Sequence, residues 1–251
     1  MPYADSYGVR IHYEVEGQGP PLVLRNGFSM TFEDWREYGY VAGLRDRYTL
    51  ILMDSRGYGA SDKPHDPSDY VLPPLVGDVI AVIDELGLSQ INFWGWSVGG
   101  GVAFALAQAA PERLKTVLIG GACAGAAVEP DEPNEFRDSV EQGGVPWLVE
   151  LWKQNLPISK AQEARLRQLD IQALSAELRA PWPSLESIPP TMSMPCLLYI
   201  GEAEGEYECA LKTSQQMPNG RFASFPGFNH FDTWARSDVV LPHVLEFLGQ
   251  G

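Results

Sequence analysis

Positively charged residues are scarce in this chain. Among its 251 residues, 18 are lysine or arginine and 33 are aspartate or glutamate, which gives a formal net charge of −15 at pH 7. A negative field of this size repels phosphate backbones and anionic lipid headgroups. The composition therefore argues against nucleic acid and membranes as partners.

Cysteine is also rare. Cys123, Cys196 and Cys209 are odd in number, and their spacing matches neither a disulfide framework nor a zinc site. We therefore predict three reduced, mostly buried thiols and no metal site.

Export, membrane and nucleotide signals are missing as well. The first 17 residues lack a basic stretch followed by an apolar one, and no apolar run approaches the ~20 residues that cross a bilayer. Glycines crowd at 99–101 without the G-x-G-x-x-G spacing of a dinucleotide site. We predict a cytoplasmic protein that needs no cofactor.

What the sequence does contain is a regular alternation of short apolar runs with amphipathic segments. An opening hairpin is followed by strands and helices in turn, which predicts a mostly parallel α/β sheet of about eight strands with right-handed crossovers. The predicted strands are 3–7, 9–15, 21–26, 48–54, 91–96, 114–121, 196–201 and 221–226, and the predicted helices are 32–44, 75–86, 98–110, 206–216 and a last one ending at 247.

The alternation stops between residues 122 and 190. This segment has no convincing strand, only short helical patterns separated by proline and glycine, and it holds three of the seven tryptophans. We interpret it as an excursion from the sheet. The predicted division is a core of 1–121 and 191–251 with an insertion at 122–190.

Gly95-Trp96-Ser97-Val98-Gly99 matches G-x-S-x-G. About 0.16 matches are expected by chance from the composition, so the pattern alone is weak. Its position is stronger evidence, because it joins an apolar strand to an apolar helix, as a nucleophile elbow requires. A sharp turn there brings the neighbours two residues before and after the serine together, and only glycine fits both positions comfortably. Ser97 is therefore the predicted nucleophile.

A serine hydroxyl needs a neighbouring base. Of the four histidines, His12 falls in the hairpin, His65 in a polar loop and His243 in the last helix, whereas His230 follows the last strand. Loops at the carboxyl ends of parallel strands meet where ligands bind, so His230 is the predicted base. The carboxylate that orients it should follow the strand 196–201, where Glu202, Glu204 and Glu206 compete.

Taken together, LVLRNGFSMTFEDW, MDSRGYGASDKP, NFWGWSVGGGVAFALA, LLYIGEAEGEYE and FPGFNHF resemble the α/β-hydrolase superfamily over nearly the whole chain. The resemblance implies the α/β-hydrolase fold with the order nucleophile, acid, histidine. Members often carry Gly-x-x-Asp after the penultimate strand. The corresponding Gly201-Glu202-Ala203-Glu204 puts Glu204 at the acid position, with Glu202 and Glu206 as fallbacks.

The resemblance also implies an oxyanion hole, made by the backbone N–H groups of Phe28 and Val98. Relatives usually have His-Gly where this chain has Asn26-Gly27. We expect Asn26 either to replace a structural hydrogen bond or to contact a polar substrate. In the loop after the fourth strand, we expect Asp54 and Arg56 to form a structural charge-assisted pair.

In the same family, an insertion such as 122–190 forms a helical cap over the nucleophile. We expect its tryptophans and leucines to line an apolar cavity or to pack the cap onto the core. The candidate wall residues are Trp147, Leu148, Leu151, Trp152, Leu156 and Trp182. The candidate substrate-binding residues are Asn26, Trp96, Trp147, Trp152 and Phe231.

The sequence thus predicts a cytoplasmic serine hydrolase that cleaves a carboxylic ester or lactone of a small to medium, partly apolar molecule, with a homodimer as one allowed assembly. Several alternatives stay open. The same triad could serve C–C bond hydrolysis, haloperoxidase or perhydrolase, thioesterase or lyase chemistry, or the fold could serve a non-catalytic receptor. Serine at the elbow argues against haloalkane dehalogenase and epoxide hydrolase, whose members in this superfamily use aspartate there.

Overall fold

The computed structural model describes residues 2–125, 127–130 and 132–249. In this part of the chain eight strands form one sheet in the order β1-β2-β4-β3-β5-β6-β7-β8. The first two strands pair antiparallel, β2 pairs antiparallel with β4, and the remaining pairs are parallel. The predicted fold class is confirmed. The strands are β1 (Tyr3–Ser6), β2 (Val9–Gly17), β3 (Pro21–Arg25), β4 (Thr49–Met53), β5 (Ile91–Trp96), β6 (Leu114–Gly120), β7 (Cys196–Gly201) and β8 (Gly220–Phe225).

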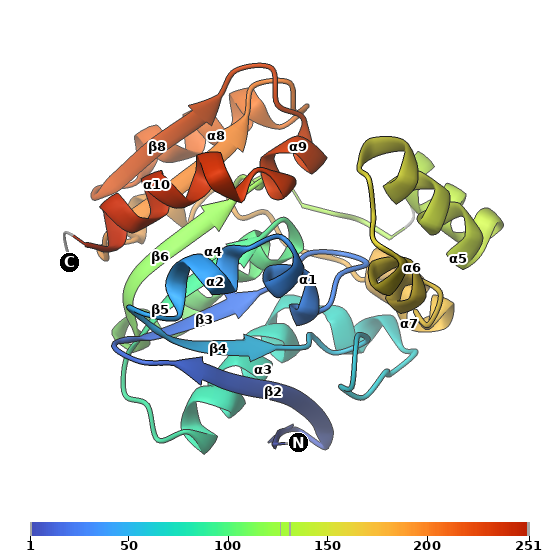
Figure 1. Ribbon diagram of the computed structural model, residues 1–251, viewed down its shortest axis with the longest axis horizontal. Coiled ribbons are helices and arrows are strands. Elements are labelled where there is room, and N and C mark those ends of the chain that lie inside the picture. Colours follow the sequence, from blue (N-terminus) through green and yellow to red (C-terminus); the bar gives the residue numbers. More distant parts are fainter. Residues whose placement is uncertain (1, 126, 131, 250–251) are drawn as a thin grey trace.

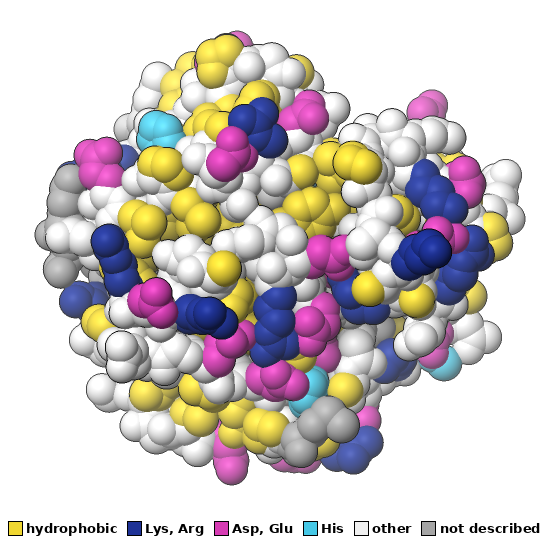
Figure 2. Space-filling view, viewed as in Figure 1, with side chains coloured by type: hydrophobic (Ala, Val, Ile, Leu, Met, Phe, Trp, Pro, Cys, Tyr) yellow, Lys and Arg dark blue, Asp and Glu magenta, His cyan; other side chains and the backbone are white. Residues whose placement is uncertain are grey.

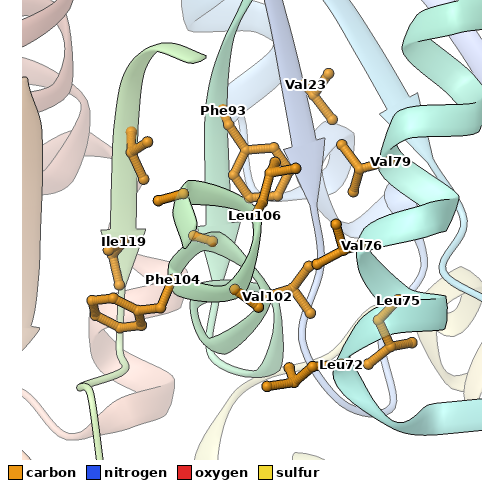
Figure 3. Close-up of a cluster of buried hydrophobic side chains, with 14 of the residues drawn as sticks. Val23, Leu72, Leu75, Val76, Val79, Phe93, Val102, Phe104, Leu106 and Ile119 are labelled. Carbon is orange, nitrogen blue, oxygen red and sulfur yellow. The ribbon is translucent and has the colours of Figure 1, made fainter. Parts of the chain in front are cut away.

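Helices cover both faces of the sheet (Figure 1). Strand side chains alternate between the faces, so each face has its own apolar core. On one face α3 (Leu72–Glu85), α4 (Val98–Ala109) and α8 (Tyr207–Gln216) pack. Figure 3 shows part of this core, where Val23 and Phe93 of the strands lie near Val79 of α3 and Val102 and Leu106 of α4. On the other face lie α1 (Phe32–Glu37), α2 (Tyr40–Leu44) and α10 (Ser237–Leu248), and α9 (His230–Ala235) precedes α10.

The helix predicted at 32–44 is two helices. Gly39 has φ of 85°, in the left-handed region, and it separates α1 from α2. The turn lets both short helices put aromatic and aliphatic side chains onto the same sheet face, including Trp35 and Tyr40, which are fully buried. The amphipathic spacing thus predicts the helical residues but not the break at Gly39.

Asp54 and Arg56 are both structural, but they do not pair with each other as predicted. Arg56 donates to the carboxylate of Asp78 on α3 at 2.5 and 2.8 Å. Asp54 lies 3.0 Å from the Nδ1 atom of His12. All four side chains are buried. Each buried carboxylate therefore has a hydrogen-bonding partner in place of water.

The segment between β6 and β7 contains further helices that lie beside the core (Figure 1), and we use the name cap for this segment. Its helices are α5 (Glu135–Asn155), α6 (Lys160–Leu166) and α7 (Ile171–Arg179). A single antiparallel bridge between Val128 and Trp182 joins the two ends of the cap segment. No helix in the described ranges is long and apolar enough to cross a membrane.

Polar contacts tie the cap to the core on both sides. Contacts from α6 reach α1 and the residue that follows it, while those from α7 and the segment after it reach loops that precede α3. The contacts are Arg165–Asp34 (2.8 Å), Gln162–Tyr38 (3.0 Å), Trp182–Tyr70 (3.1 Å) and Glu177–Tyr58. The cap therefore sits as a bridge across the carboxyl edge of the sheet.

The prediction of three reduced thiols is wrong in the structure. Cys123, just after β6, forms a disulfide with Cys209 of α8, and Cys196 stays free and buried. The two cysteines lie 86 residues apart, and only the fold brings them together. Because disulfides persist mainly in oxidising compartments, this pair also weighs against the predicted cytoplasmic location.

The disulfide predicts a thiol count. Protein purified without reductant and unfolded in guanidinium should show one reactive thiol with Ellman's reagent, and three after reduction. Reduction should also lower the free energy of unfolding by about 2–4 kcal/mol, because the unfolded chain regains the entropy of a long loop. Three thiols before reduction would contradict the pairing, and Cys209→Ser, which frees Cys123, should show two.

Glu177 of α7 is a buried carboxyl, with 8% of its surface exposed. Burial raises its pKa to about 7, against the hydrogen bond from Tyr58 and the attraction of Arg25, which both lower it. The native state therefore keeps a proton on Glu177 at a pH where the unfolded chain has lost it. The stability that this group contributes is full below about pH 4.5 and is lost as the pH rises through 7.

We expect the free energy of unfolding of the wild type, relative to Glu177→Gln, to fall by about 3 kcal/mol between pH 4.5 and 8. Denaturant unfolding of both proteins at several pH values measures this difference. Glu141→Gln is the matched control on the cap. Bonds from Arg179 and Ser175 lower the pKa of Glu141, so its contribution is complete above about pH 4.5 and is lost only at lower pH. Relative to this variant, the wild type should therefore lose no stability between about pH 4.5 and 8. A difference between wild type and Glu177→Gln that does not change with pH would contradict the raised pKa.

Candidate active site

Ser97 sits at a strained turn between β5 and α4. Its backbone angles, φ of 53° and ψ of −114°, lie outside the regions that residues other than glycine ordinarily adopt. A Cβ on Gly95 would collide with the carbonyl group of Gly99, and a Cβ on Gly99 would lie 2.5 Å from the carbonyl oxygen of Arg25. The two glycines of the motif are therefore steric requirements of this turn. Ser97 is half-buried, and its hydroxyl makes no hydrogen bond within the described residues.

His230 follows β8, as predicted, but it is the first residue of α9 and not part of the loop before it. Its Nδ1 atom lies 2.6 Å from the Oε2 atom of Glu204. The other carboxylate oxygen of Glu204 accepts bonds from the Gly201 amide (2.8 Å) and the Thr233 hydroxyl (2.9 Å). Only 5% of the Glu204 side chain is exposed. The carboxylate is thus fixed in one orientation, and it holds the imidazole so that Nε2 is the ring nitrogen left to accept a proton.

The other two glutamates of this loop lie elsewhere. Glu202 accepts a bond from the Ser224 hydroxyl at 2.8 Å, on the surface. Glu206 stands at the rim of the cavity described below, and no hydrogen bond joins it to His230 among the described contacts. Desolvation by the neighbouring residues raises the pKa of Glu206. The attraction of His230 lowers this pKa, and the negative charge of Glu204 raises it. Of the three candidates, Glu204 is the one in contact with His230.

The loop Gly27-Phe28-Ser29 passes beside the elbow. A Cβ on Gly27 would lie 3.0 Å from the Cβ of Ser97 and 3.1 Å from the indole of Trp96. In the described part of the chain, neither the Phe28 nor the Val98 amide donates a hydrogen bond to another protein group. Val98 is the first residue of α4, where N–H groups are unpaired by geometry. Two unused donors therefore border the same site as Ser97.

Asn26 does not face this site, which corrects its assignment as a substrate-binding residue. It is 1% exposed, and its amide donates to the Met30 carbonyl at 2.5 Å and to the Gly27 carbonyl at 3.3 Å. The Ser55 hydroxyl lies 3.5 Å from its side-chain oxygen. Asn26 therefore braces the loop, which is the structural alternative that the sequence left open.

A cavity of about 950 Å³ lies between cap and core and contains Ser97, His230 and Glu204 in its wall. In Figure 2 hydrophobic side chains gather in the hollow between the cap and the C-terminal helices. Of the predicted binding residues, Trp96, Trp152 and Phe231 line it. The other apolar residues of the wall include Phe28, Met30, Phe136, Leu151, Leu178 and Trp182.

Trp147 is not in the wall of the cavity. It packs against Phe136, with ring centroids 5.6 Å apart, in a cluster between cap and core. Leu148 and Leu156 are also buried outside the lining. An α-helix turns only part of its surface toward one neighbour, so half of the predicted wall serves packing instead.

Two residues of the site had no signal in the sequence. Ser29 and Glu177 both line the cavity, but one is a serine in a loop and the other a glutamate in a charged helix. Only the tertiary fold shows that both are buried beside Ser97. In the described residues no group of three His, Cys, Asp or Glu side chains has the arrangement of a metal site.

A model of the family with the alpha/beta hydrolase fold matches residues 20–180. The chain is 33% identical over 155 residues to "Bifunctional epoxide hydrolase 2" of Sus scrofa, which covers 62% of this chain and 27% of that protein. It is 26% identical to a "Putative non-heme chloroperoxidase" of Synechocystis sp., over 99% of this chain and all of that protein. The chain thus spans about a quarter of the pig protein, so that protein's activity does not transfer as a whole.

The solved structure of an enol-lactonase from Burkholderia xenovorans superposes with a TM-score of 0.85, at 22% identity, over 99% of this chain and all of that one. At this identity the likeness supports the fold alone. The relatives named above support hydrolase activity at the level of the family, but they do not identify the bond that this chain cleaves. From the matching model and the eight-stranded sheet with its serine elbow, the chain belongs to the α/β-hydrolase fold family.

Proposed function

We propose that the protein is a serine hydrolase that cleaves a carboxylic ester or lactone through an acyl-enzyme. The observation that carries the proposal is the buried Glu204 carboxylate, 2.6 Å from Nδ1 of His230, in the same cavity wall as an unbonded Ser97 hydroxyl. An acid, a base and a nucleophile in this relation are what acyl transfer requires. Hydrogen bonds between serine and histidine are often long in ligand-free enzymes and shorten when substrate binds.

In the proposed reaction the Ser97 oxygen attacks the carbonyl carbon while Nε2 of His230 takes the hydroxyl proton. The Phe28 and Val98 N–H groups bind the oxyanion that forms. His230 then gives its proton to the leaving alcohol as the C–O bond breaks. Water, activated by His230, attacks the acyl-enzyme and releases the acid and free Ser97. Glu204 fixes the tautomer and stabilises the imidazolium throughout.

The cavity wall indicates an uncharged substrate. None of the described residues that line the cavity is a lysine or arginine, whereas two glutamates outside the proposed triad, Glu177 and Glu206, do line it. A bound carboxylate would lose its hydration without gaining a cationic partner. Above about pH 7, where Glu177 loses its proton, it would also be repelled by the charge of that glutamate. We therefore infer a neutral, partly apolar substrate of small to medium size, for which about 950 Å³ is ample.

One specific observation favours a second candidate function. The relative that matches 99% of this chain is named a putative non-heme chloroperoxidase. The same acyl-enzyme attacked by hydrogen peroxide instead of water would release a peracid, so perhydrolase chemistry uses every residue of the proposed site. The epoxide hydrolase relatives say less about the reaction of this chain, because it has serine at the elbow where those enzymes use aspartate.

Ser97→Ala should lower kcat/KM for p-nitrophenyl butyrate by about 10³-fold or more, because the acyl-enzyme cannot form. Glu204→Gln should lower it by about 10²- to 10⁴-fold, since the amide favours the wrong tautomer of His230. Glu202→Gln is the matched control on the same loop and should keep wild-type activity. Initial rates on p-nitrophenyl esters and small lactones measure all three. Equal losses in Glu202→Gln and Glu204→Gln would mean that Glu204 has no special role.

Charge selection is tested with two esters of p-nitrophenol, the hexanoate and the adipate monoester, which differ by a terminal carboxylate. We expect kcat/KM to be at least about tenfold lower for the anionic ester at pH 8, because the wall provides only negative charge. Glu206→Gln should narrow this ratio, whereas the surface variant Glu202→Gln should leave it unchanged. If the wild type hydrolyses both esters equally well, the inference of a neutral substrate is wrong.

A further inference from the structure

Ser29 follows the proposed oxyanion donor Phe28 and has an unusual backbone. Its φ is 60°, although it is not glycine, and 7% of its surface is exposed. A side chain in the left-handed region is unfavourable by itself and persists where its surroundings hold it there. The peptide that carries the Phe28 N–H is one residue away, so whatever fixes Ser29 also fixes the direction of that donor.

One restraint on Ser29 comes from α5 of the cap. The indole Nε1 of Trp152 donates to the Ser29 hydroxyl at 2.9 Å. Trp152 is 4% exposed and packs edge-on against Phe231, next to His230, with ring centroids 5.3 Å apart. This bond therefore runs directly from the cap to the loop beside the nucleophile.

A second restraint comes from α7 of the cap through one core residue. The Ser29 N–H donates to the Tyr58 hydroxyl oxygen at 3.4 Å, and the Tyr58 hydroxyl donates to the carboxylate of Glu177. Tyr58 is 1% exposed. Because Glu177 engages the hydroxyl proton, the lone pairs of the Tyr58 oxygen remain to accept from Ser29. The hydroxyl and the N–H of Ser29 are thus bound to different cap helices, the hydroxyl directly and the N–H through Tyr58.

We propose that Trp152 and, through Tyr58, Glu177 are positioning residues that hold the Gly27–Ser29 loop so that the Phe28 N–H meets the oxyanion. The cap would then help to position the oxyanion hole as well as enclose the cavity, because moving the cap away from the core would break both sets of hydrogen bonds to Ser29. This inference rests on the proposed acyl-transfer function. The cap contacts Arg165–Asp34 and Gln162–Tyr38 fall on α1 and on the residue after it, and Trp182–Tyr70 falls on the segment before α3, so none of these three involves the Gly27–Ser29 loop.

The role has a kinetic signature. Oxyanion donors must lie within about 2.7–3.1 Å of the developing charge, and a misplacement of about 1 Å can cost 10²-fold in rate. Substrate binding itself depends on the apolar wall instead. Loss of a restraint should therefore lower kcat and the affinity for a transition-state analogue in the same ratio, with KM little changed.

The first test is Ser29→Ala, which removes the acceptor for Trp152 and leaves the indole in place. We expect kcat for p-nitrophenyl butyrate to fall about 10- to 100-fold, with KM within about twofold. The inhibition constant of an alkyl trifluoromethyl ketone, which forms a tetrahedral adduct, should rise in proportion to the loss in kcat. Tyr58→Phe, which removes the acceptor for the Ser29 N–H, should give the same pattern.

A double-mutant cycle separates this hydrogen bond from general packing. Trp152→Phe combined with Ser29→Ala should be no slower than the slower of the two single variants, because both break one bond. Trp147→Phe is the matched control, with the same substitution on the same helix at a residue outside the cavity wall. It should keep the wild-type kcat and inhibition constant.

Two results would overturn the inference, and they differ from failure of the proposed function. If Ser29→Ala and Tyr58→Phe keep the wild-type kcat and inhibition constant, the loop needs no support from the cap, although the protein is still a hydrolase. If the losses in Trp152→Phe and Ser29→Ala multiply, they do not act through a shared bond. If the wild type hydrolyses no ester or lactone and a fluorophosphonate does not label Ser97, the proposed function fails and the inference fails with it.

Discussion

The rest of the site depends on the strained backbone at Ser97. A positive φ at a serine is maintained because β5 and α4 are both buried and their junction leaves no room for a relaxed turn. The constraint reaches outward, since the same close approach requires glycine at 95 and 99 and brings the carbonyl of Arg25 against the start of α4. The turn that exposes the hydroxyl therefore also fixes where β3 ends and where the loop after it begins.

The parallel arrangement of the strands brings the other residues of the site to Ser97. Because neighbouring parallel strands end at the same edge, the loops after β3, β5, β7 and β8 all meet there. They bring Phe28, Ser97, Glu204 and His230 to one cavity wall from four distant parts of the sequence. The cap then closes this edge and adds its own apolar side chains, among them Leu151, Trp152 and Leu178, to those that the core loops provide.

Most of the sheet could be predicted from the sequence, because a buried parallel strand is a short apolar run and its signal is local. The same holds for the positions of Ser97 and His230 in the fold, and the roles proposed for them follow from their places relative to such runs. The contacts across the fold could not be predicted. The Cys123–Cys209 pair and the inward-facing Glu177 each depend on segments far away in sequence. The bonds of Asn26 depend on how the loop at 27–30 folds back onto its side chain. Likewise, helical spacing gives the apolar face of α5 but not which part of that face meets the cavity, so Trp147 was placed there wrongly.

The disulfide gives the chain a topology that the ribbon does not suggest. Cys123 and Cys209 close a covalent ring that holds the whole of α5, α6, α7 and β7 between them. A peptide bond broken anywhere in that ring would leave both pieces attached, since the remaining path through the sulfurs is intact. Cys123 also lies in the cavity wall, so the ring closes next to the nucleophile's own strand. The segment that contains the cap helices is thereby joined to the rest of the chain by the disulfide as well as by its peptide bonds.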